Sequence, residues 1–160
     1  MLILITDIFY RKSFDVISIL KHQYHSKDLL LGLPKQSDKF LANCIYGICK
    51  TSVVFTGIKE NFFKDLARLS LQYDNEKIVY VPVEEQTTAW FIEYVERNGK
   101  QNFLFVLPDS NTYSLLRNKF TLNEFCLKNN ISSPKLFNLN ELREEDFPIL
   151  AKPCTGSGSR

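Results

Sequence analysis

Five short apolar runs are spaced along the first 107 residues, and each has the length of a β-strand. Leucine, isoleucine, valine and phenylalanine dominate these runs without strict alternation, which is typical of parallel strands buried on both faces. A glycine, a proline or a polar residue closes each run. We therefore predict strands over residues 2–6, 28–33, 52–55, 77–83 and 103–107.

Three longer segments between these runs carry large apolar side chains three or four residues apart. This spacing places the side chains on one face of an amphipathic α-helix. The three apolar stripes are Phe14, Ile17, Leu20 and Tyr24; Phe62, Leu66, Leu69 and Tyr73; and Trp90, Phe91, Tyr94 and Val95. Asn98 and Gly99 then end the third helix in a glycine stop. Residues 41–48 are apolar but mixed in period, and their structure is left open.

Strands that alternate with helices predict an α/β fold, here an open, doubly wound parallel sheet with about five strands. Each connection between two predicted strands is long enough for a crossover helix. The character of the chain changes after Pro108. We therefore assign residues 1–108 to the α/β domain and residues 109–160 to a C-terminal helical extension.

The extension begins with a helical stretch at residues 111–119. Thr121 and Glu124 have the spacing of a capping box, which predicts a second helix from Leu122 to residues 129–130. An extended linker follows and ends at Pro134. Residues 147–153 predict a short strand that carries Lys152 near its end, and a loop of small residues comes next.

Composition and charge remove several classes of function. The apolar fraction is 44% and the formal net charge is +2, which excludes a disordered chain. Basic residues do not gather in one dense stretch, so we expect no nucleic-acid partner. No stretch approaches the ~18 apolar residues of a membrane helix, and no signal peptide is recognisable. The four cysteines are scattered, and we expect free thiols in a cytoplasmic protein that has no membrane partner.

The loop after Lys152 is the most informative chemical feature. Its small residues are Gly156, Ser157, Gly158 and Ser159. Such residues let backbone amides approach phosphate oxygens closely, and a neighbouring lysine adds a positive charge for the same phosphates. A flexible linker has the same composition, so the loop alone does not decide its function. The order of residues is not that of a P-loop, in which the lysine follows the glycines.

Residues 118–160 as a whole resemble the ATP-grasp family, particularly its carbamoyl-phosphate-synthase-like carboxylate–amine ligases. The resemblance rests on the order and spacing of five parts, none of them specific alone. These parts are Lys119, a helix after Thr121, a turn leading to Pro134, the Phe-Pro-Ile-Leu-Ala-Lys-Pro segment at residues 147–153, and the loop at residues 156–160. The preceding α/β region is similar in pattern to the Rossmann-like N-terminal domain of that family. Asn118 departs from the family, which usually has aspartate before the lysine.

The resemblance implies an ATP-dependent ligase that activates a carboxylate as an acyl-phosphate for attack by an amine or similar nucleophile. Lys119 and Lys152 would contact the ATP phosphates, and the loop of Gly156, Ser157, Gly158 and Ser159 would close over them. ATP and magnesium are the implied cofactors, and a small-molecule carboxylate is the implied substrate. The resemblance leaves a homodimer open.

In that family the magnesium ligands and a catalytic arginine follow the loop, whereas this sequence stops at Arg160. We therefore expect an N-terminal piece that is inactive by itself and carries no catalytic or metal-binding residue. We also expect the chain after Leu107 to be less ordered than the five strands, because the strand at residues 147–152 lacks a partner.

A non-catalytic α/β module that binds a small ligand or a partner subunit is the alternative function. A receiver domain is disfavoured, because no phosphoacceptor aspartate follows Phe55 at the end of the third strand. A dinucleotide site is disfavoured, because no glycine follows the first strand. If that first loop has only a structural role, Ser13 is expected to be the N-cap of the next helix. His22 and His25 are three residues apart, without a third metal ligand nearby in the sequence.

Overall fold

The computed structural model describes residues 1–25, 28–47 and 53–156. The chain divides into two compact units, Met1–Leu107 and Pro108–Arg160. Of the predicted features, Ser52 in the third strand and Ser157, Gly158 and Ser159 in the final loop lie outside the described residues.

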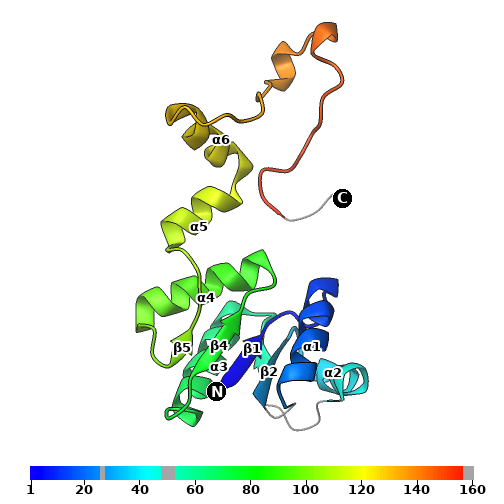
Figure 1. The fold of residues 1–160 in the computed structure, drawn as a ribbon. Coiled ribbons are helices and arrows are strands. Elements are labelled where there is room, and N and C mark those ends of the chain that lie inside the picture. Colours follow the sequence, from blue (N-terminus) through cyan, green and yellow to red (C-terminus); the bar gives the residue numbers. More distant parts are fainter. Residues whose placement is uncertain (26–27, 48–52, 157–160) are drawn as a thin grey trace. The chain divides into compact units, whose positions relative to one another are not determined.

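The first unit contains five parallel strands in the order β3-β2-β1-β4-β5 (Figure 1). The strands are β1 Leu2–Ile5, β2 Leu29–Leu33, β3 Val53–Phe55, β4 Ile78–Val81 and β5 Phe103–Leu104. β1 lies in the middle of the sheet, where Ile3 is opposite Leu29 of β2 and Val79 of β4. The predicted five-stranded parallel sheet is confirmed.

Helices connect the strands, and the three amphipathic stripes correspond to three of them. The helices of this unit are α1 Arg11–Gln23, α2 Lys39–Tyr46, α3 Lys59–Gln72 and α4 Glu85–Asn98, with a 3₁₀ turn at Gln36–Asp38 before α2. Most of the stretch at residues 41–48, whose structure the pattern left open, belongs to helix α2. Gly99 follows α4 with φ of 77°, as the predicted glycine stop requires.

Helices cover both faces of the sheet because successive strand residues point to opposite sides. In β1, Leu2 and Leu4 pack in a buried cluster with side chains of α3 and α4. Ile3 and Ile5 pack in a second cluster with side chains of α1 and α2. The doubly wound α/β architecture is thereby confirmed.

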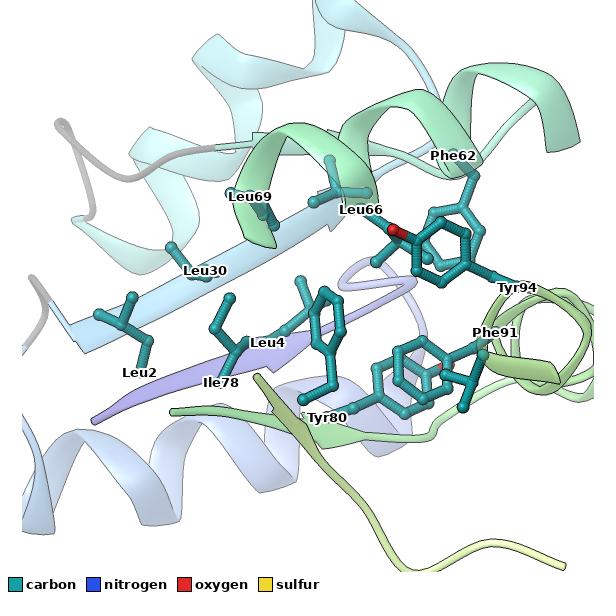
Figure 2. Packing of buried hydrophobic residues seen from close by; sticks show 13 residues of the cluster. Leu2, Leu4, Leu30, Phe62, Leu66, Leu69, Ile78, Tyr80, Phe91 and Tyr94 are labelled. Carbon is teal, nitrogen blue, oxygen red and sulfur yellow. The ribbon is translucent and has the colours of Figure 1, made fainter. Parts of the chain in front are cut away.

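Figure 2 shows the cluster on the α3–α4 face. Phe62, Leu66 and Leu69 of α3 are fully buried in it. The ring of Tyr80 in β4 stacks on Phe91 of α4, with ring centroids 3.8 Å apart. Full burial of one large apolar side chain contributes about 1.5–3 kcal/mol, so this cluster stabilises the first unit strongly.

The prediction is wrong at two positions of the first helix. Phe14 is half exposed, whereas Ser13 is fully buried. Ser13 is not the N-cap, because α1 already begins at Arg11 and the Ser13 hydroxyl donates to the Asp7 carbonyl at 2.7 Å. This hydrogen bond turns Ser13 inward, and a neighbouring residue in a helix then points about 100° away.

β5 is shorter than predicted. It ends at Leu104, because the strand pairs with β4 only at Ile78 and Val79. Val106, which the prediction placed in a buried strand, is 99% exposed. The apolar run at residues 103–107 is therefore longer than the part of it that pairs with β4.

The second unit contains α5 Ser110–Arg117, α6 Lys119–Lys128 and the 3₁₀ turns Leu139–Glu141 and Glu144–Asp146. The predicted capping box at Thr121 is wrong. Asn118 caps α6 three residues earlier, and the Thr121 hydroxyl donates to the Asn118 carbonyl at 3.1 Å. Asparagine is a strong N-cap, so it starts the helix before the threonine can.

The strand predicted at residues 147–153 is also wrong. In the described chain this segment has no regular secondary structure and pairs with no other strand. An extended segment cannot become part of a sheet without a neighbour to receive its backbone hydrogen bonds.

Candidate functional site

The junction of α5 and α6 places Lys119. The amide of Asn118 donates to the Ser114 carbonyl at the end of α5. The Asn118 side chain accepts from the amides of Phe120 at 3.0 Å and Thr121 at 3.4 Å. One asparagine therefore ends α5 and begins α6, which fixes Lys119 as the first residue of α6.

Lys119 contacts the loop that follows Lys152 through two hydrogen bonds. Its amide donates to the Cys154 carbonyl at 2.8 Å, and its Nζ donates to the Gly156 carbonyl at 3.0 Å. Gly156 has φ of 104°, a conformation that strongly favours glycine. Two parts predicted to bind the same phosphates, 37 residues apart in the sequence, thus lie side by side within the second unit.

Lys152 lies two residues before Cys154 and is exposed. Within the described part of the chain, no hydrogen bond or ion pair engages its ammonium group. Ser157, Gly158 and Ser159 are the other predicted loop residues, and they lie outside the described residues. The structure therefore places Lys119 beside the start of the loop. That Ser157, Gly158 and Ser159 cover the phosphates stays a prediction.

The backbone amides at the start of α6 are already engaged. Lys119 donates to Cys154, Phe120 and Thr121 donate to the Asn118 side chain, and Leu122 donates to the Asn118 carbonyl. A helix N-terminus attracts an anion mainly through amides that have no other partner. An anion at this place would therefore have to be held by the lysine ammonium groups and by loop amides, not by the helix.

The first unit has a shallow cavity of about 350 Å³ beside β4 and the segment that follows β5. Its lining is almost entirely apolar: Val79, Tyr80, Val81, Pro82, Leu104, Phe105 and Val106. No lysine or arginine lines it, and the cavity therefore offers no cationic group for a phosphate.

A second polar feature lies at the carboxyl ends of the strands in the first unit. Asp7 follows β1 and is almost completely buried, and its Oδ2 accepts from Thr87 Oγ1 of α4 at 2.5 Å. Thr6 and Thr56, which follow β1 and β3, are buried as well. Thr6 Oγ1 lies 3.5 Å from the hydroxyl of Tyr80. These side chains form what we call the β1–β4 polar cluster: Thr6, Asp7, Thr56, Tyr80 and Thr87.

Burial raises the pKa of the Asp7 carboxyl above its ordinary value. Hydrogen bonds from Thr87 and Thr6 act in the opposite direction, and the negative charge of Glu84 raises the pKa further. Burial also raises the pKa of Tyr80 to about 12. The cluster therefore contains one acid whose charged form is costly and one phenol that stays protonated at neutral pH.

The β1–β4 polar cluster was not among the predicted sites. A usable signal was present, because Thr6 ends one predicted parallel strand, Asp7 follows it directly, and Thr56 follows another. The carboxyl ends of parallel strands meet at one edge of the sheet. Nothing in the sequence pointed to Thr87, because its place in the first turn of α4 becomes meaningful only when the strand order is known.

No protein-family model, curated protein or solved structure matches this chain. Membership of the ATP-grasp family therefore stays a prediction. No helix within the described ranges has both the length and the apolar character that a membrane crossing requires. His, Cys, Asp and Glu side chains of these ranges also form no group that could hold a metal ion.

Proposed function

We propose that this chain binds the phosphates of ATP through Lys119, Lys152 and the loop around Gly156, as part of an ATP-grasp-type ligase. The observation that carries the proposal is the pair of hydrogen bonds from Lys119 to the carbonyls of Cys154 and Gly156. The first residue of α6 is thereby in contact with a loop residue 37 positions further along the chain, and the resemblance assigns both residues to the same phosphates.

The side chains of Lys119 and Lys152 suit a polyphosphate ligand. Lys119 and Lys152 supply two positive charges at the start of a loop whose glycine has a backbone conformation suited to a tight turn. ATP, when bound, supplies the phosphoryl group that activates a carboxylate. The residues of this chain bind and orient the phosphates, and the carbonyl of Gly156 gives up the Lys119 ammonium when a phosphate oxygen replaces it.

Within the described residues, no three His, Cys, Asp or Glu side chains form a group that could hold a metal ion by themselves. We assign no step to a metal for that reason. The role that we propose for the residues of this chain is phosphate recognition. The same proposal includes a carboxylate substrate and an amine or similar nucleophile, both defined only by chemical class.

Calorimetric titration of the 160-residue chain with ATP tests this function. We expect Lys119→Ala and Lys152→Ala each to weaken binding about tenfold or more, because a hydrogen bond to a charged group contributes roughly 1.5–3 kcal/mol. Lys128→Ala is the matched control, since it removes the same charge from the other end of α6. Equal affinity in all four proteins, or equal loss in all three variants, would contradict the proposed site.

A small-ligand-binding α/β module remains a second candidate function. The β1–β4 polar cluster favours it, because that cluster lies in the first unit and involves none of the predicted phosphate-binding residues. The two functions are compatible, since each uses a different unit.

A further inference from the structure

The sheet of the first unit ends at β5, and within the described ranges no strand pairs with the outer edge of β5. On its inner side, the Asn102 carbonyl accepts from the Ile78 amide of β4 at 3.0 Å. Backbone groups of successive residues alternate between the two sides of a strand. The carbonyl of Phe103 and both backbone groups of Phe105 therefore point to the outer edge, where the described chain offers them no hydrogen-bond partner.

The sequence of this edge does not protect it. Residues 103–107 are Phe-Leu-Phe-Val-Leu, without a charged residue or a proline. Folded proteins usually place lysine, proline or a β-bulge on a free edge, because its unpaired amides and carbonyls otherwise pair with another strand. The outer edge of β5 is therefore suited to receive a strand, which can satisfy the outward backbone groups as a packed helix cannot.

Exposed apolar side chains lie along the same edge. Leu104 and Val106 are 45% and 99% exposed. They line the cavity of about 350 Å³, together with Val79 and Val81 of β4. Phe105 lies between them in the sequence and packs against the cluster on the α3–α4 face. A partner at this edge would thus gain apolar contacts in addition to backbone hydrogen bonds.

The charges at the two ends of the edge are opposite in sign. Lys77 and Lys100 precede β4 and β5, and both are exposed. Glu76, an acid at the same end, is already paired with the amino terminus of the chain at 2.9 Å. Glu85 lies at the other end, as the first residue of α4 after β4. An antiparallel second copy would place its basic end against the acidic end of the first, and a two-fold axis would repeat this contact.

The register of the sheet brings Lys100 near Glu85 in such a pair. Val79 is opposite Leu104, an offset of 25 residues, so Glu85 lies near the level of residue 110. When Phe105 is opposite Phe105 of the second copy, residue 100 is opposite residue 110. Charge complementarity therefore favours a second copy of this chain over an unrelated strand as the partner.

We propose that two copies of this chain associate through the outer edges of β5, antiparallel to each other and related by a two-fold axis. Phe105 exchanges backbone hydrogen bonds with its own copy, and Leu104 of each copy packs beside Val106 of the other. Lys100 of each copy lies near Glu85 of the other. Because the paired segment is short, the dimer exchanges with the monomer.

Sedimentation velocity of the 160-residue chain over a wide range of protein concentrations tests the dimer. The experiment contains no nucleotide, so its failure and the failure of the phosphate site around Lys119 are distinguishable. We expect a monomer–dimer equilibrium. A monomer at every concentration would overturn the proposal and would leave the edge to a strand of another protein, and an assembly that grows beyond the dimer would overturn it as well.

A charge placed on the edge should weaken the dimer. Val106→Lys should raise the dissociation constant at least tenfold, because both copies then carry a lysine between the paired strands. Leu71→Lys is the matched control, since it makes a similar change at a side chain of α3 that is 79% exposed and lies away from the edge. Equal dimerisation of Val106→Lys and the wild type, or equal losses in the two variants, would contradict the edge contact.

Exchange of the two charges identifies the symmetric arrangement. Lys100→Glu and Glu85→Lys each place like charges at both contacts, and each should dimerise about tenfold more weakly than the wild type. An equimolar mixture of the two variants has opposite charges at both contacts and should form a mixed dimer with about the wild-type affinity. A folding defect cannot produce this recovery. A mixture that associates no better than the separate variants would overturn the proposal.

Discussion

The two units of this chain use apolar residues in different ways. In the described residues, every buried hydrophobic side chain belongs to the first unit, between Leu2 and Phe103. The second unit also contains large apolar side chains, but those of Phe120, Leu127, Phe147 and Leu150 are between 49% and 76% exposed. The comparison shows that an apolar pattern leads to burial only where neighbouring elements close around it.

Hydrogen bonds at defined positions take the place of a core in the second unit. Asp109 caps α5, Asn118 caps α6, and Asn123 donates to Ser133 and to the Pro134 carbonyl. Such contacts hold short segments together, and each contributes only about 1 kcal/mol. We therefore expect the two units to respond differently to the same kind of substitution.

Removing a core side chain should give the largest difference. Leu66→Ala in α3 should lower the free energy of unfolding by about 2–5 kcal/mol, because it leaves a cavity in a fully buried cluster. Leu127→Ala in α6 removes the same atoms from a side chain that is 63% exposed and should cost less than about 0.5 kcal/mol. Urea denaturation measures both, and similar losses would show that the second unit has a core after all.

A glycine in the sheet should be the next most sensitive position. A Cβ added to Gly32 would lie 2.7 Å from the Thr6 Cα and 3.0 Å from a methyl group of Thr56. Because one neighbour is backbone, Gly32→Ala should destabilise the first unit by about 1–3 kcal/mol. Gly47→Ala is the comparison variant. Its added Cβ would have no atom within 4 Å, but Gly47 has a φ of 64°, so this variant introduces backbone strain without steric overlap. An unchanged urea midpoint for Gly32→Ala would contradict this packing.

Asn118 provides the corresponding test in the second unit. Asn118→Ala removes the acceptor for the Phe120 and Thr121 amides and should cost about 1 kcal/mol of local stability. Amide exchange at these two positions should become roughly fivefold faster, while exchange in β1 and β4 stays unchanged. Thr121→Val is the control, since Thr121 is not the cap. A larger effect of Thr121→Val would restore the capping box that the structure replaced.

The smallest expected change has the opposite sign. The Asp7 pKa is raised by burial, so between pH 3.8 and the folded-state pKa the folded protein binds more protons than the unfolded chain. The free energy of unfolding of the wild type therefore falls as the pH rises through that window. Asp7→Asn lacks this loss and should be more stable than the wild type at pH 7.5, with the difference shrinking towards pH 4.

Urea midpoints at several pH values measure the Asp7 effect. Asp15→Asn, an exposed acid on α1, is the control and should follow the wild type. A stability difference between Asp7→Asn and the wild type that stayed constant with pH would mean that Asp7 has the same pKa in both states.

Most of the first unit could be predicted because the apolar patterns of its strands and of most helix positions agree with the final packing. The run from Leu2 to Ile5 is apolar on both faces, and β1 is covered on both faces. Ser13 and Phe14 exchange their expected burial because a hydrogen bond to Asp7 orients the start of α1. That contact depends on the loop conformation, which no periodic pattern encodes.

The second unit was harder to predict because its competing signals are of similar strength. Asn118 and Thr121 are both acceptable helix caps, and the one that also ends α5 starts α6. The segment at residues 147–153 has a strand-like composition, but strand formation also requires a partner. The contact between Lys119 and Gly156 was anticipated only in the sense that both were expected near the same phosphates.

Amide hydrogen exchange on the whole chain, with and without ATP, tests the central claim most directly. That claim is that Lys119 and the loop at Cys154 and Gly156 form one phosphate-binding element. We predict slow exchange in β1 and β4 and fast exchange at residues 150–156 in the free chain, and slower exchange at Lys119 and Gly156 once ATP is added. Exchange at Lys119 and Gly156 that is unaffected by saturating ATP would contradict the claim.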